Sequence, residues 1–185
     1  MQLLQTNHWE EQYFLSLDLF EMSASISCIN GDISNMPMCL NEILSNARTF
    51  DDSLKASSLL VKLLASSSKF NEARSNCLVI LSNLGEVFPS NASLPEVLRE
   101  LSVLQTKLRT ITRDQIKSLP LMTNVDKLNV MKFLNMLCMS SIMSKPLLLP
   151  LLSCRMVELT MEYGFCADSI VGLTTAGYSI VSYMP

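Results

Sequence analysis

The chain contains a single histidine, His8, which precedes the first apolar pattern and stands beside Trp9 and two glutamates. An imidazole in such company could act as a general base or accept a phosphoryl group. A lone histidine in a lead-in segment more often faces solvent, and we expect that of His8.

Two pairs of carboxylates have a spacing that could support acid–base chemistry. Asp51 and Asp52 are adjacent, and Glu158 and Glu162 are four residues apart with Arg155 nearby. The first pair stands where a helix should begin, and negative charge is favourable at that end of the helix dipole. The second pair would share one solvated helix face. We therefore predict no catalytic role for either pair.

Six cysteines are spread irregularly along the chain, at Cys28, Cys39, Cys77, Cys138, Cys154 and Cys166. No two of them form a CxxC pair, and a zinc site needs four ligands that converge. Each cysteine lies on or near an apolar helical stripe. We predict free, buried thiols, no metal site and a reducing, cytoplasmic location.

The nearest approach to a phosphate-binding loop is the run from Gly172 to Ser179. Its glycine spacing fits, but Tyr178 stands where the loop needs a lysine to contact phosphate oxygens. Kinase loop signatures and a nucleophile elbow do not occur. The sequence predicts no catalytic residue, no cofactor, no small-molecule substrate and no enzymatic activity for this chain.

Composition limits the classes of partner. The 185 residues are 49% hydrophobic and 17% charged, with a net charge of −3 and basic residues scattered among acids. A chain this apolar should pack a core rather than stay disordered. Because no basic stripe is present, we predict no nucleic-acid binding. The N-terminus lacks the basic and apolar regions of a signal peptide.

One run is long enough to span a bilayer, from Phe133 to Cys154, with Lys145 as its single charge. Lys145, Pro146 and Pro150 lie near its middle, where charge and helix breakage are costly in lipid. Two helices meeting at a turn explain the run better. A membrane-associated hairpin is the less favoured alternative.

Periodicity predicts helices throughout. Residues 12–30 carry two apolar stripes, the first with Tyr13, Leu17, Phe20, Ala24 and Cys28, the second with Leu15, Leu19, Met22 and Ile26. A helix with two apolar faces is typically covered on both. Gly31 should end this helix, and Gly85 a later one.

The predicted elements are two helical hairpins followed by four helices. Asp51 or Asp52 could cap the second hairpin, and Ser93 with Glu96 forms a capping box. The last segment is rich in β-formers, yet we predict a helix there, with its glycines at a close helix crossing. The hairpins cover about 12–48 and 51–86, and the helices about 93–111, 124–143, 147–163 and 166–183.

The second hairpin resembles tetratricopeptide repeats. Leu60, Val61 and Leu64 take large, small and large places, although Val61 is bulkier than usual, and Lys69–Ala73 resembles the turn-plus-alanine signature. In the first hairpin Gly31-Asp32-Ile33 matches the turn, but Met36 replaces the small alanine. A period just under forty residues is typical of helical solenoids.

Two further segments, Leu119–Leu134 and Leu148–Gly164, resemble the helical region of large multidomain signal-transduction kinases. The likeness covers nearly the whole chain from about Tyr13. In that family a protein-kinase domain and a nucleotide-binding ATPase module precede the helical region, and histidine-kinase domains follow it. The resemblance implies a scaffold or regulatory region, and it transfers no catalytic residue.

Together these patterns predict an all-α chain of about seven helices, stacked as antiparallel tetratricopeptide-like hairpins over 12–185 after a lead-in at 1–11. We expect a non-catalytic scaffold that contacts a partner protein or another domain. Lys55, Ser58 and Lys62 would then line a concave groove for an acidic or C-terminal segment. The alternative is a regulatory cap of an ATPase or kinase. The apolar run before Met184-Pro185 suggests a fragment of a longer protein.

Overall fold

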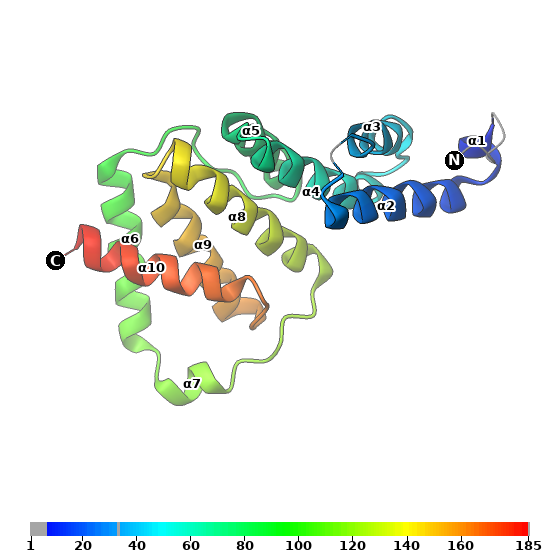
Figure 1. Ribbon diagram of the computed structural model, residues 1–185. Coiled ribbons are helices and arrows are strands. Elements are labelled where there is room, and N and C mark those ends of the chain that lie inside the picture. The colour runs from blue at the N-terminus through cyan, green and yellow to red at the C-terminus, as the bar shows by residue number, and fades with distance from the viewer. Residues whose placement is uncertain (1–6, 33, 185) are drawn as a thin grey trace. The chain divides into compact units, whose positions relative to one another are not determined.

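The computed structural model describes residues 7–32 and 34–184 (Figure 1). Over these residues the chain is all-α, as predicted, with ten helices and a single isolated β-bridge between Leu121 and Phe165. The predicted number was about seven. Two short helices, α1 and α7, lie in segments for which no helix was predicted. Ile33 and Pro185, named above, lie outside the described residues.

The helix bounds follow the predicted ranges closely. They are α1 His8–Glu11, α2 Tyr13–Asn30, α3 Met36–Asn46, α4 Phe50–Ser66, α5 Phe70–Asn83, α6 Leu94–Thr110, α7 Arg113–Lys117, α8 Val125–Ser144, α9 Leu148–Tyr163 and α10 Ser169–Tyr183. The chain divides into two compact units, Met1–Lys69 and Phe70–Pro185. The stacking of hairpins as one repeat domain over 12–185 stays a prediction.

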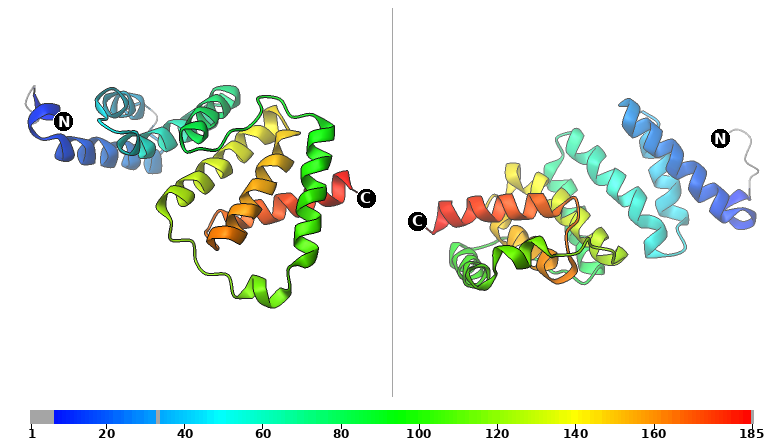
Figure 2. Two further views of the ribbon diagram at one scale, coloured as in Figure 1. Left: turned by 180° about the vertical axis from the view of Figure 1, so that it is seen from behind. Right: turned by 90° about the horizontal axis from the view of Figure 1, so that it is seen from below.

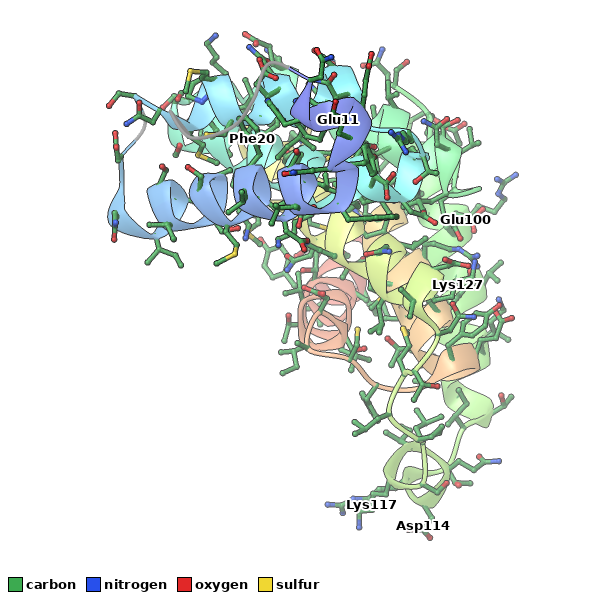
Figure 3. The ribbon with its side chains drawn as sticks, turned by 90° about the vertical axis from the view of Figure 1, so that its right-hand side faces the viewer. Glu11, Phe20, Glu100, Asp114, Lys117 and Lys127 are labelled. Carbon is green, nitrogen blue, oxygen red and sulfur yellow. The ribbon has the colours of Figure 1, made fainter. Side chains whose placement is uncertain are left out.

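The first unit is built on one face of α2. The predicted first stripe is buried there from Tyr13 to Ala24, whereas Cys28 is only partly buried, contrary to the prediction. The stripe packs with Cys39, Leu40 and Ile43 of α3 and with Ala56 of α4. Phe20 points from α2 into this core (Figure 3). The second stripe is exposed, so the expectation that α2 is covered on both faces is wrong for this unit. Its neighbours α3 and α4 both pack on the first stripe.

The residue that caps the start of α4 is not one of the two predicted. Thr49, rather than Asp51 or Asp52, is the N-cap, and its hydroxyl accepts from the Asp52 amide at 3.2 Å. The Asp52 carboxylate accepts in return from the Thr49 amide at 3.2 Å. This reciprocal pair is a capping box, in which aspartate takes the place of the usual glutamate or glutamine.

His8 does not face solvent freely, contrary to our expectation. Its Nδ1 lies 2.9 Å from the Ser16 hydroxyl, and its ring stacks on Phe20 with centroids 5.8 Å apart. Trp9 stacks on the same phenylalanine at 5.4 Å. The short helix α1 therefore turns these rings back onto α2, which a pattern of periodic apolar residues could not indicate. His8 is part of the packing here.

In the second unit α9 is the central helix and contacts α6, α8 and α10 (Figures 1 and 2). The apolar run from Phe133 to Cys154 belongs to α8 and α9, which are separated by Lys145, Pro146 and Leu147. The two-helix interpretation of this run is confirmed. In the part of the chain that the structure describes, no helix has the length and apolarity needed to cross a membrane.

The last segment is helical, as predicted, and one of its two glycines explains how it packs. A Cβ added at Gly172 would lie 2.6 Å from the Cβ of Met156 on α9, closer than real Cβ atoms come to their neighbours. A Cβ added at Gly177 would meet nothing within 4 Å. The close crossing of α9 and α10 therefore depends on Gly172 alone.

Glycines also end two helices of this unit in conformations that other residues rarely adopt. Gly85 follows α5 with φ +86°, and the next amide, of Glu86, donates to the Leu81 carbonyl at 2.8 Å, which is the bonding of a Schellman cap. Gly164 follows α9 with φ +100°, and a Cβ added there would overlap the Pro120 carbonyl oxygen. Gly85 as a helix end is thus confirmed.

Candidate binding groove

The three residues predicted to line a groove lie on α4, and of the three, Lys62 borders the hollow between α2, α3 and α4. Lys55 Nζ lies 2.8 Å from Glu21 Oε2, and its side chain is half exposed. Ser58 is buried, and its hydroxyl donates to the Lys55 carbonyl at 2.9 Å. Lys62 is exposed and borders a small hollow. Because Ser58 bonds to its own helix, it has no hydroxyl proton to offer a ligand.

The hollow beside Lys62 has a volume of about 220 Å³ and lies between α2, α3 and α4. Cys28, Met36 and Leu63 give it a mainly apolar lining. Asp32 at its edge accepts from the Ser34 amide at 3.1 Å and from Asn35 Nδ2 at 3.2 Å. These bonds, with one from the Ser34 hydroxyl, lower the pKa of Asp32 and hold it in a local turn.

A larger groove lies in the second unit, between α6 and α9. These helices run side by side in the same direction, so the C-terminal half of one faces that of the other (Figure 1). The pocket between these halves has a volume of about 380 Å³. Leu104 and Val157 are buried at its base, and Leu108, Ile111 and Met161 are partly exposed along it.

The groove continues towards the N-terminal halves of the same helices. There a second pocket of about 270 Å³ lies beside the segment that follows α5. Its apolar lining comes from Val87, Phe88, Pro89, Leu151 and Cys154, and its polar lining includes Glu96, Arg99 and Glu100. Both pockets share Arg155 and Glu158. These two residues therefore mark the boundary between the halves of the groove.

Arg155 is fixed by a two-pronged ion pair. Its Nε donates to Glu86 Oε2 and its Nη2 to Glu86 Oε1, both at 2.8 Å. Hydrogen bonding to Glu86 raises the pKa of Arg155 above its ordinary value, although burial opposes that shift. Glu86 itself is buried, with Lys127 Nζ at 3.8 Å as a second counter-charge. The Schellman turn at Gly85 sets the position of Glu86.

The ion pairs continue from Arg155 across the groove. Arg155 Nη1 lies 3.4 Å from Glu158 Oε2, and Glu158 also pairs with Lys107 of α6. The bridge Glu86–Arg155–Glu158–Lys107 thus joins the segment after α5 to α9 and α6. Figure 3 shows Lys127 near the start of α8 and Glu100 on α6. Since charged groups in the bridge already pair with one another, they order the groove rather than offer a free acid or base.

The predicted pair Glu158 and Glu162 is only partly a solvated face. Arg155 does offset Glu158, as expected, but Glu158 also pairs with Lys107 and lines both pockets. Glu162 hydrogen-bonds to Tyr163, which raises the pKa of the tyrosine. Among the described residues, no group of three or more histidine, cysteine or acidic side chains could hold a metal ion.

Reasoning from the sequence missed this groove and Glu86. Glu86 and Arg155 are 69 residues apart, and periodicity within one helix carries no information on such a pair. The one available signal was an acid directly after a helix-ending glycine and between Leu84 and Val87. No family model, no curated protein and no solved structure matches the chain.

Proposed function

We propose that this chain is a non-catalytic helical interaction module whose α6–α9 groove binds an apolar segment of a partner protein or of another domain. The groove carries the proposal: it combines an apolar base with a polar bridge that is held in place before any ligand arrives. Order of this kind lowers the entropy that binding costs. Partly exposed Leu108, Ile111 and Met161 offer the contact surface.

The size of the pockets indicates what they accept. Volumes of about 380 and 270 Å³ lie near the lower end of the range for small-molecule sites, and each pocket suits one or two large apolar side chains. Their two-part arrangement along parallel helices suits a segment with anchors on both sides of the Arg155 bridge. Helix-in-groove recognition uses anchors spaced in this way.

The resemblance of Leu119–Leu134 and Leu148–Gly164 to the helical region of large signal-transduction kinases supports a scaffold or regulatory role. On this proposal the hairpins stack as tetratricopeptide-like repeats within a longer signalling protein. The six free cysteines suit a reducing, cytoplasmic location. Burial raises the pKa of Cys77, Cys138 and Cys154 to about 12, so these three thiols serve packing and not reaction.

A peptide selection tests the binding role. A random peptide library is displayed and selected on the purified full chain, and selected peptides are measured against variants. We expect Leu108→Glu and Met161→Glu each to weaken binding about tenfold or more, because a carboxylate would enter the apolar pocket. Val103→Glu is the matched control, since Val103 is 44% exposed on α6 and does not line either pocket.

The proposal fails if selected peptides bind all three variants equally, or if no peptide is enriched. Circular dichroism of each variant verifies that the helices are intact. A separate assay addresses the non-catalytic part of the proposal. ATP hydrolysis by the purified chain, once contaminating enzymes have been removed, would contradict it. Kinase or ATPase motifs in adjoining chain would favour the regulatory-cap alternative over a free-standing scaffold.

A further inference from the structure

The uncovered face of α2 carries a continuous row of apolar side chains, which we term the α2 seam. Its members recur at spacings of four, three, four and three residues along the helix. They are Leu15, Leu19, Met22, Ile26 and Ile29, with exposed fractions of 51%, 41%, 57%, 53% and 83%. An average spacing of 3.5 residues is that of a coiled-coil seam.

The seam lies on the side of α2 opposite its buried face. Leu17, Phe20 and Ala24 point into the core of the first unit, about half a helical turn away from Met22. Within the first unit, no described residue covers the seam. An apolar row of this length and period is suited to a second helix, because only a helix brings side chains to it at the same repeat.

We propose that the α2 seam pairs with the α2 seam of a second copy of this chain. The charges along its edges favour that occupant. Asp18 and Ser25 border one side, and Ser23 the other, while the charge of Glu21 is already matched by Lys55. With one free acid at each seam, two copies place no carboxylates opposite each other. A strongly charged partner would gain nothing from edges made of serine.

The area of the seam sets the strength of the association. Five partly exposed side chains form a patch of roughly a few hundred Å². Stable interfaces bury about 800 Å² on each partner, so the dimer is reversible and weak, in the micromolar range. In either relative orientation of the helices, Met22 lies at the middle of both seams.

Sedimentation velocity on the full chain, from low to high micromolar concentration, tests the pairing. We expect a monomer–dimer equilibrium, which Met22→Glu weakens about tenfold or more. Met38→Glu is the matched control, because Met38 is 54% exposed on the side of α3 away from its buried stripe. A chain that stays monomeric throughout, or that loses its dimer equally in both variants, overturns the inference.

A charge-swap experiment identifies the occupant. Met22→Glu and Met22→Lys should each be monomeric alone. Mixing them should restore a heterodimer, since the introduced carboxylate and ammonium groups attract each other at the middle of the seam. If mixing restores nothing, the seam does not pair with itself. Circular dichroism shows whether both variants keep their helices. This outcome is independent of the α6–α9 groove, so failure here leaves the peptide selection unaffected.

Discussion

Glu86 shows how one buried charge can organise a surface. It accepts two hydrogen bonds from Arg155 and has Lys127 as a further counter-charge, so its desolvation is compensated by partners on two helices. Through Arg155 and Glu158 its influence reaches Lys107 on α6. The polar part of the groove therefore depends on a residue that lines neither pocket.

Replacing Glu86 by glutamine should destabilise the second unit. The change removes a charge-assisted pair and leaves Arg155 without its main partner, at a cost of about 1.5–3 kcal/mol. Urea denaturation measures the change in the free energy of unfolding. Glu100→Gln is the control, because the Glu100–Arg99 pair is exposed and should cost under about 1 kcal/mol. Equal losses of unfolding free energy in the two variants would show that the buried Glu86 pair stabilises the chain no more than an exposed pair does.

Asp52 gives the first unit a dependence on pH. Hydrogen bonds from Tyr13, at 2.6 Å, and from Thr49 lower the pKa of Asp52 below its ordinary value of 3.8, although burial opposes the shift. A carboxyl with a lowered folded-state pKa stabilises the fold above its unfolded pKa. That contribution is lost as the pH falls from about 4 through the folded-state value.

We expect the free energy of unfolding of the Asp52→Asn variant to fall less steeply with pH below about pH 4 than that of the unsubstituted chain. At neutral pH the variant should be less stable by about 1 kcal/mol, the usual cost of a lost helix cap. Chemical denaturation at a series of pH values measures both effects. Asp51→Asn serves as the control, since Asp51 lies in the same turn without the Tyr13 bond. If Asp52→Asn left the pH dependence of stability below about pH 4 unchanged, Asp52 would not be its cause.

At the scale of elements, the crossing of α9 and α10 rests on the absence of one side chain. Gly172 lets the backbone of α10 approach Met156, whereas Gly177 stands in open space on the same helix. The two glycines therefore form a natural pair of test and control. Both lie within α10, and an added methyl group would meet α9 at Gly172 but nothing at Gly177.

Gly172→Ala should destabilise the chain by about 1–3 kcal/mol, because the added methyl group overlaps Met156 and forces the helices apart. Gly177→Ala should instead stabilise it by about 0.5–1 kcal/mol, since alanine restricts the unfolded chain and favours a helix. Thermal or urea unfolding separates the two outcomes. A gain in stability from both substitutions would mean that the crossing is looser than the structure shows.

At the scale of the whole molecule, the chain has two compact units with separate cores. The first unit buries the apolar stripe of α2 against α3 and α4, and part of the second buries Val97, Leu101 and Leu104 against α9 and α10. Since each unit has its own contacts, we expect each to unfold as its own cooperative step.

Differential scanning calorimetry should then resolve two transitions. Asp52→Asn should lower the midpoint of one transition, and Gly172→Ala that of the other, because each substitution acts within one unit. The double variant should combine the two shifts without interaction. A single transition that both substitutions lower would show that the units unfold together.

The helices were predictable from the sequence because their signals are local. The stripe from Tyr13 to Ala24, the capping box at Ser93 and the helix end at Gly85 each depend on residues within a few turns. Where the signal was ambiguous, as at α10, the prediction of a helix with a glycine at a close crossing also proved correct, although only for Gly172.

The groove and the uncovered seam were decided by tertiary structure alone. Apolar spacing reveals that a helix has two faces to cover, yet not which neighbour covers them, and α2 keeps one of its faces bare. Likewise, Glu86 and Arg155 meet because α5 ends beside α9, not because of any pattern in either segment. Local periodicity reports the order of side chains along a helix, whereas partners distant in sequence depend on how the helices pack.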